Sequence, residues 1–178
     1  MKKMFILVLL LAFWHPGTDR AQDGQITEYR LKAAFLYHFA KFVTWPASAF
    51  ADSTEPIIIG VIGRDPFGRD LEKTVAGKTV RGRRFVVKRF RHIADLEFCH
   101  ILFITPSERK HVGEILRRID SKSVLTVGDT RSFATQGVII NLFSENYKIR
   151  FDINAAAAKE AGLRISSRLL RLAKRVQM

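Results

Sequence analysis

The sequence predicts an α/β fold: a three-layer sandwich with a mostly parallel twisted sheet of about six strands, a C-terminal antiparallel hairpin and helices on both faces. Three observations carry this prediction. Short, continuous apolar runs recur along the chain, as in parallel strands that helices cover on both sides. Segments with a helical period separate these runs, and two strand-like segments near the end follow each other directly.

The first residues have the pattern of an export signal. Two lysines precede an apolar run over Met4–Trp14, and Ala21 supplies a small residue where a signal peptidase could cut. The run is shorter than the ~20 apolar residues that cross a bilayer. We therefore expect residues 1–21 to be a secretory signal peptide and residues 22–178 to form a single exported domain.

The exported domain begins with a long predicted helix over residues 26–44, whose wide apolar arc indicates packing on more than one side. The Trp45-Pro46 pair ends it, because the residue before a proline is pushed out of helical geometry. A polar loop over residues 47–55 leads to the first predicted strand, Ile57–Ile62.

The turn Gly63–Gly68 follows, with Asp65 as the predicted N-cap of a short helix that ends near Gly77. The next predicted strands cover residues 85–90, 100–104 and 124–127, and Ser107 is the predicted cap of the helix between the last two. These elements alternate as expected for a parallel sheet.

The chain ends with a predicted hairpin, residues 138–143 and 148–153, joined by a four-residue loop. Asn154 is the predicted cap of an alanine-rich helix that Gly162 ends. A last helix is predicted over residues 166–176, with basic residues on its outer side.

The net charge of the chain is +13, and two basic blocks, the first over Lys78–Arg91 and the second over Arg164–Arg175, contain no acidic residue. In an exported protein such blocks suit an acidic protein surface or anionic lipid head groups better than nucleic acid. A solvated basic face that only aids solubility is the alternative. The candidate partner contacts in these blocks are Lys78, Arg81, Arg83, Arg84, Arg164, Arg168, Arg171 and Arg175.

Nothing in the sequence indicates an active site. Cys99 is the single cysteine, so no internal disulfide is expected, and its apolar neighbours predict a buried, inert thiol. The histidines have no metal-ligand spacing, and no serine lies in a nucleophile elbow. We expect no catalytic, cofactor-binding or metal residues and no enzymatic activity.

The best small-ligand candidate is the edge where the predicted strands end. Free backbone N–H groups in the Gly63–Gly68 turn could attract an anion, and ligands of open parallel sheets gather at the carboxyl ends of strands. A purely structural turn is the alternative. The candidate crevice residues are Arg64, Asp65, Ser107 and Asp129.

Five segments in order carry a family resemblance: Glu28–Tyr37, the turn Gly63–Gly68, Cys99–Ile104, Val124–Asp129 and Ile153–Ala173. Together they resemble the YfiR-like family of periplasmic proteins over nearly the whole exported chain. The resemblance implies a regulator: a repressor that binds the periplasmic domain of an inner-membrane diguanylate cyclase, or a similar sensor, and holds it inactive.

The resemblance implies further partners as well. An outer-membrane lipoprotein can sequester such a repressor, and a homodimer is compatible with the family. Members can carry redox-responsive disulfides, from which a chain with only Cys99 departs. A periplasmic module that binds a small anion or metabolite in the strand-edge crevice is the alternative function.

Overall fold

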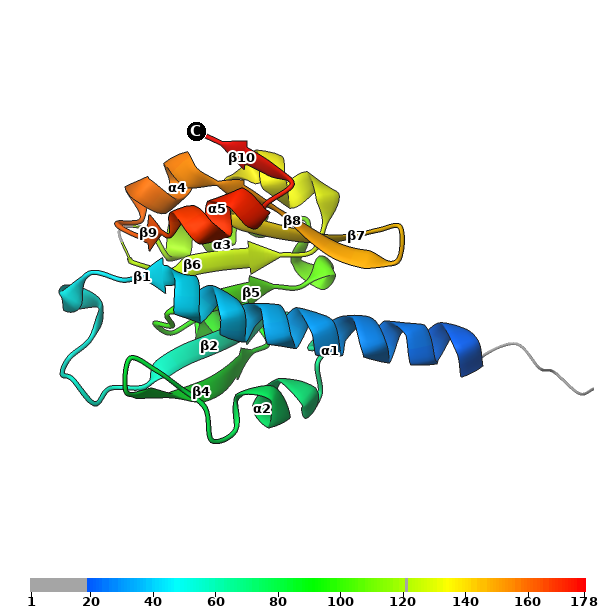
Figure 1. Ribbon diagram of the computed structural model, residues 1–178, viewed down its shortest axis with the longest axis horizontal. Coiled ribbons are helices and arrows are strands. Elements are labelled where there is room, and N and C mark those ends of the chain that lie inside the picture. Colours follow the sequence, from blue (N-terminus) through cyan, green and yellow to red (C-terminus); the bar gives the residue numbers. More distant parts are fainter. Residues whose placement is uncertain (1–18, 121) are drawn as a thin grey trace, which may run out of the picture.

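The computed structural model describes residues 19–120 and 122–178, and an eight-stranded sheet forms its centre (Figure 1). The strands are β1 (Val43–Thr44), β2 (Ile57–Ile62), β3 (Thr79–Val80), β4 (Arg83–Phe90), β5 (Ile101–Ile104), β6 (Leu125–Gly128), β7 (Ile140–Glu145), β8 (Lys148–Asn154), β9 (Arg164–Ile165) and β10 (Arg175–Gln177). The helices are α1 (Asp19–Phe42), α2 (Asp70–Val75), α3 (Val112–Arg118), α4 (Ala155–Glu160) and α5 (Ser167–Leu172).

The sheet is mostly parallel, which confirms the predicted fold class. Its strand order is β10-β8-β7-β6-β5-β2-β4-β3, and β4, β2, β5, β6 and β7 run parallel to one another. The hairpin partner β8 is antiparallel to β7. The short strands β1 and β9 form a separate antiparallel pair beyond the C-terminal end of α1.

Side chains of the central strands pack into two apolar layers, one on each face of the sheet. In β5, Ile101 and Phe103 belong to the layer that contains Phe39 of α1, whereas Leu102 and Ile104 belong to the layer that contains Ile115 of α3. Helices on both faces therefore explain why these strands have no polar alternation. Complete burial of one such side chain contributes about 1.5–3 kcal/mol.

The predicted last helix over residues 166–176 is wrong in its second half. Ser166 caps α5 by accepting from the N–H of Leu169, but the helix ends at Leu172. The chain then extends, the N–H of Lys174 donates to the carbonyl of Phe151 at 2.8 Å, and β10 pairs with β8. Open backbone groups along β8 compete with the helix for this segment, and residue patterns do not reveal such groups.

Two predicted helix caps are also wrong. α2 begins at Asp70 and α3 at Val112, several residues after Asp65 and Ser107. Both short polar side chains make other bonds: Asp65 accepts from the N–H of Phe67, and Ser107 accepts from the N–H of Arg64. By contrast, Asn154 accepts from the N–H of Ala157 at the start of α4, which confirms the third predicted cap.

The hairpin loop is shorter than the predicted four residues. Glu145 pairs with Lys148, which leaves only Asn146 and Tyr147 in the turn, with φ of +50° and +58°. Positive φ at both central positions defines a type I′ turn, whose twist matches that of the strands.

The predicted signal peptide lies outside the described residues, apart from its last three positions in the first turn of α1. Within the described part of the chain, no helix has both the length and the apolar character needed to cross a membrane.

Candidate partner-binding surface

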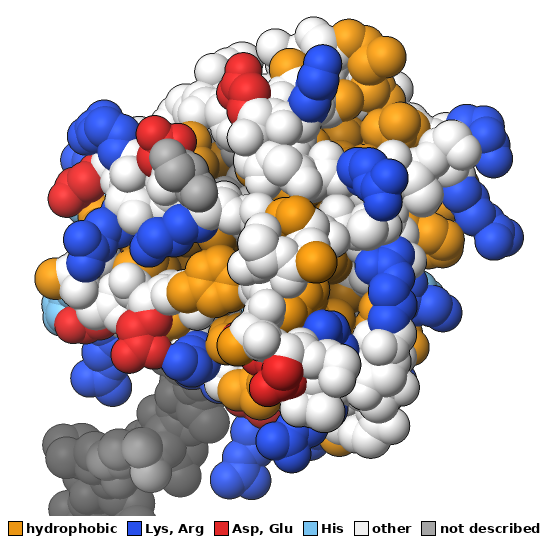
Figure 2. Space-filling model, turned by 90° about the vertical axis from the view of Figure 1, so that its left-hand side faces the viewer, with side chains coloured by type: hydrophobic (Ala, Val, Ile, Leu, Met, Phe, Trp, Pro, Cys, Tyr) orange, Lys and Arg blue, Asp and Glu red, His pale blue; other side chains and the backbone are white. Residues whose placement is uncertain are grey.

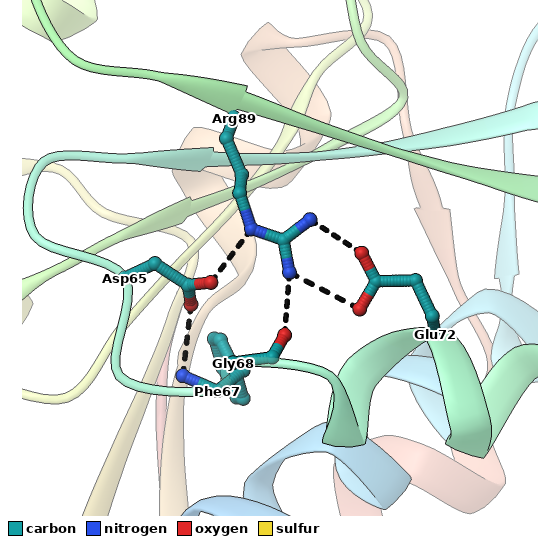
Figure 3. Close-up of polar contacts among 5 residues, drawn as sticks. All are labelled: Asp65, Phe67, Gly68, Glu72 and Arg89. Carbon is teal, nitrogen blue, oxygen red and sulfur yellow. Dashed lines mark hydrogen bonds and ion pairs between the residues drawn. The ribbon is translucent and has the colours of Figure 1, made fainter.

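The turn after β2 is fastened by one arginine at the carboxyl end of β4 (Figure 3). Nε of Arg89 donates to Asp65 Oδ2 at 2.6 Å, and its guanidinium also bonds both carboxylate oxygens of Glu72 and the carbonyl of Gly68. The hydrogen bond from Arg89 lowers the pKa of the Glu72 carboxyl and raises that of Arg89 itself. Both carboxylates are therefore engaged in holding the turn against the start of α2.

The hydroxyl of Ser107 lies against the same turn. Its Oγ accepts from the N–H of Arg64 at 3.0 Å, lies 2.9 Å from Thr105 Oγ1 and donates to Glu108 Oε1 at 2.9 Å. Arg64 itself projects into solvent. The structure thus brings Arg64 and Ser107 together through the backbone of the turn.

Asp129, directly after β6, is buried against α1. Its carboxylate accepts from Lys32 Nζ at 2.9 Å and from the Tyr29 hydroxyl at 2.7 Å, and the side chains of Asp129 and Lys32 are 1% and 4% exposed. Glu28 supplies Lys32 with a second carboxylate at 2.6 Å. Burial, followed by the charge of Asp129, raises the pKa of Tyr29 far above its ordinary value. These bonds tie the middle of α1 to the end of β6.

Sequence reasoning missed Tyr29 and Lys32 as partners of Asp129. The Glu28–Lys32 pair has the i,i+4 spacing of a helical ion pair and could have been noticed. The Lys32–Asp129 bond joins residues 97 positions apart, so no local pattern indicates it.

Three of the four candidate crevice side chains are therefore occupied by bonds within the protein, and Arg64 projects into solvent. Asp65 bonds Arg89, Ser107 bonds the turn, and Asp129 bonds α1, although Asp129 Oδ1 has no hydrogen-bond partner among the described residues. None of these residues lines the main cavities of the described part of the chain. Ligand binding at this edge stays a prediction.

At the amino ends of the parallel strands, two arginines of the first basic block donate hydrogen bonds to uncharged oxygen atoms. Arg81 donates to the carbonyl of Val43 at 3.1 Å and to Thr44 Oγ1 at 2.9 Å. Arg83 donates to the carbonyl of Glu55 at 2.7 Å, and its guanidinium lies 3.8 Å from the centre of the Phe50 ring. Carbonyls and rings orient these guanidinium groups without neutralising their charge.

Residues of the second basic block reach the same place from the far end of the sequence. Arg164 in β9 pairs with Thr44 in β1, and the Arg168 guanidinium lies 5.9 Å from the Phe42 ring at the end of α1. Figure 2 looks onto this end of the molecule and shows Lys and Arg side chains around its rim, with hydrophobic side chains exposed between them. We call Arg81, Arg83, Arg84, Arg164 and Arg168 the basic end.

Three candidate contacts lie around or away from this group. Lys78 is exposed, with Nζ 4.7 Å from the centre of the Tyr37 ring, and Arg171 is exposed on α5. Arg175 belongs to β10, where its Nε lies 3.6 Å from Asp152 Oδ2. Because α5 ends at Leu172, the second block does not form one helical face.

Cys99 and His100 are buried, as the sequence predicts for the thiol. Burial raises the pKa of Cys99 to about 12, so the thiol stays protonated. His100 Nδ1 accepts from the N–H of Ile58 at 3.1 Å, and Nε2 lies 3.0 Å from the carbonyl of Ala49. Burial lowers the pKa of His100, because the charged ring would lose its hydration. The neutral ring with its proton on Nε2 satisfies both partners.

The comparisons with known proteins agree with this architecture. A family model described as YfiR/HmsC-like matches residues 29–174. No curated protein matches the chain. The crystal structure of a conserved domain protein from Vibrio cholerae O1 biovar eltor str. N16961 has a TM-score of 0.57 at 13% identity, over 84% of this chain and 60% of that one. An ABC domain from Streptococcus pneumonia, solved with L-Trp, has a TM-score of 0.49 at 10% identity, over 67% of this chain and 54% of that one. The chain thus spans less than two thirds of each of these proteins.

Proposed function

Because the chain belongs to the YfiR/HmsC-like family, we propose that it is a periplasmic regulatory protein that binds the periplasmic domain of an inner-membrane signalling protein. The partner is a diguanylate cyclase or a similar sensor, and binding holds it inactive. The proposal includes two further partners that the family resemblance implies, an outer-membrane lipoprotein that withdraws the repressor and a second copy of the chain.

The observation that carries the proposal is the basic end. Arg81 and Arg83 are held in fixed positions by carbonyl oxygens, while Arg84 is exposed and forms no ion pair with a described residue. A surface of this kind favours an acidic partner through complementarity and speeds the encounter. At the carboxyl edge of the sheet, by contrast, Arg89 pairs with Asp65 and Glu72, and Asp129 pairs with Lys32.

Inhibition follows from unequal binding to two conformations of the partner. A repressor that binds both conformations equally shifts nothing, whereas a swing from 1:99 to 99:1 needs about 5.5 kcal/mol of preference. No bond is made or broken in this mechanism. The charges of the basic end would contribute to the preference if the inactive partner presents more carboxylates to them.

The test measures cyclic-di-GMP in cells that express the proposed partner, a membrane diguanylate cyclase. Deletion of this chain should raise cyclic-di-GMP, and the wild-type chain should restore the low level. The double variant Arg84→Glu with Arg168→Glu should fail to restore it, because two exposed cations of the basic end become anions.

The matched control is Arg109→Glu with Lys110→Glu, which makes the same charge change at exposed positions after β5. This control should repress like the wild type. Equal loss in both variants, or full repression by the basic-end variant, would contradict a role for this surface. Unchanged cyclic-di-GMP after deletion, together with no membrane sensor recovered by cross-linking, would contradict the proposed function itself.

A further inference from the structure

The strand β4 has a free edge. β2 pairs with it on one side over Phe85–Phe90, while on the other side β3 pairs only with Arg83 and Arg84. No described strand pairs with the outer side of residues 86–90. A continuous, unpaired strand edge is a template for another extended chain, and proteins usually cover or break such edges.

The direction of the free backbone groups follows from the ladder. The carbonyl of Phe90 accepts from the N–H of Gly63, so Phe90 turns its backbone groups toward β2. Because N–H and C=O of one strand residue point to the same side and alternate along the strand, those of Val87 and Arg89 point outward. None of these four groups has a backbone partner in the described chain.

A groove accompanies this edge on the α2 side of the sheet. Its volume is about 480 Å³, and its apolar lining comes from Val75 at the end of α2, from Ala76 after it and from Phe85 and Val87 of β4. Its charged lining comes from Glu72, which bonds Arg89, and from the cations Lys78 and Arg84. A chain added to the edge would place every second side chain over this groove, because side chains alternate between the faces of a sheet. Apolar side chains suit these positions.

Cations lie on the other face, together with Val86 and Phe90, and at both ends of the edge. Arg84 and Lys88 alternate with Phe85 and Val87, and Lys78 and Arg91 lie near the two ends. Lys88 pairs with Glu97 at 2.6 Å, whereas no described carboxylate pairs with Lys78, Arg84 or Arg91. A second copy of β4 would place cations against cations, which is unfavourable across a strand pair.

We propose that the β4 edge binds an extended acidic segment of the partner protein, which adds to the sheet as a further strand. The segment bonds the outward groups of Val87 and Arg89, and its side chains alternate between apolar and acidic. This inference rests on the proposed function, since it says how a protein partner is gripped. Strand addition of this kind takes affinity from backbone bonds and specificity from alternate side chains.

The experiment uses a short synthetic peptide in which valine and glutamate alternate, with a valine–lysine peptide as the charge control. The valine–glutamate peptide should bind, and hydrogen exchange should slow at the amides of Val87 and Arg89. A version with N-methyl groups on alternate residues should not bind, because it cannot complete the ladder.

Two variants of the protein sharpen the result. Val87→Pro removes an N–H that points outward and leaves the β2 ladder intact, so the fold should survive while affinity falls about tenfold. Val87→Ala keeps the N–H and should retain most of the affinity. Arg84→Glu should move the preference from the glutamate peptide toward the lysine peptide.

The outcomes separate the alternatives. Equal binding of both peptides, no protection at Val87 and Arg89, or no loss in Val87→Pro relative to Val87→Ala would overturn strand addition. A wild-type dimer that Val87→Pro dissociates would show a second copy on this edge and would also overturn the acidic partner. Repression of cyclic-di-GMP that survives Val87→Pro would leave the proposed function standing without this mode of binding.

Discussion

At the carboxyl ends of the parallel strands, cations pair with carboxylates: Arg89 lies between two of them, and Lys32 is buried with Asp129. At the amino ends, by contrast, Arg81 and Arg83 donate to backbone carbonyls. In the first region these cations are neutralised by carboxylates, and the Lys32–Asp129 pair is buried. In the second region no described carboxylate neutralises these arginines. The contrast suggests that substitutions at the carboxyl edge change stability, while substitutions at the basic end change partner binding.

The largest expected effect tests the buried side of this contrast. Asp129→Ala leaves Lys32 buried with only the half-exposed Glu28, so the free energy of unfolding should fall by about 3 kcal/mol. Urea denaturation measures the loss. The control is Lys73→Ala, which removes an ion pair of a side chain that is 71% exposed and should cost less than about 0.5 kcal/mol.

The next effect concerns the clamp, by which we mean the bonds from Arg89 to Asp65, Glu72 and Gly68; the Arg89 side chain is 37% exposed. Arg89→Ala should lower the free energy of unfolding by about 1–2 kcal/mol, because the bonds to Glu72, Asp65 and Gly68 are lost from a partly solvated site. It should also reduce the loss of stability on acidification below the ordinary Glu72 pKa of 4.5. Above that pH the lowered pKa of Glu72 stabilises the fold, and protonation of Glu72 at lower pH removes that contribution. An unchanged acid profile in Arg89→Ala would count against the clamp.

A third effect comes from His100, which is buried as a neutral ring. Its pKa is lowered in the fold, so the unfolded chain binds the extra proton and stability should fall as pH drops below 6.5. One proton limits the slope to about 1.4 kcal/mol per pH unit. His100→Gln should flatten this slope between neutral and mildly acidic pH. The control His92→Gln alters an exposed ring and should keep the slope.

The smallest effect on stability belongs to the basic end. Arg84→Glu should change the free energy of unfolding by less than about 0.5 kcal/mol, since the side chain is exposed and has no carboxylate partner among the described residues. Thermal unfolding beside the repression assay checks both halves of the contrast. A large loss of stability here would show that this cation, too, supports the fold.

Local patterns explain how much of the fold the sequence could predict. The continuous apolar runs placed the central strands, and Asn154 was identified as a cap from its position before an alanine-rich segment. Two of the failures share one cause: a competing partner lies far away in the sequence. Ser107 bonds the turn at Arg64, and Lys174 bonds β8, so neither follows its local preference.

The candidate site was predictable to a smaller extent. The two basic blocks were recognised from composition, but their meeting at the end of α1 depends on the pairing of β1 with β9. The free edge of β4 depends on strand order, which no single segment encodes. Spatial convergence of this kind is a property of topology, and topology follows from many weak preferences acting together.

Burial of Cys99 makes the protein well suited to site-directed labelling. The chain has one cysteine, and its thiol is buried with a pKa raised to about 12, so thiol reagents should not react with it in the folded state. A cysteine introduced at an exposed position would then carry a fluorophore or spin label alone. Distances from such labels would test whether the chain binds the proposed membrane partner.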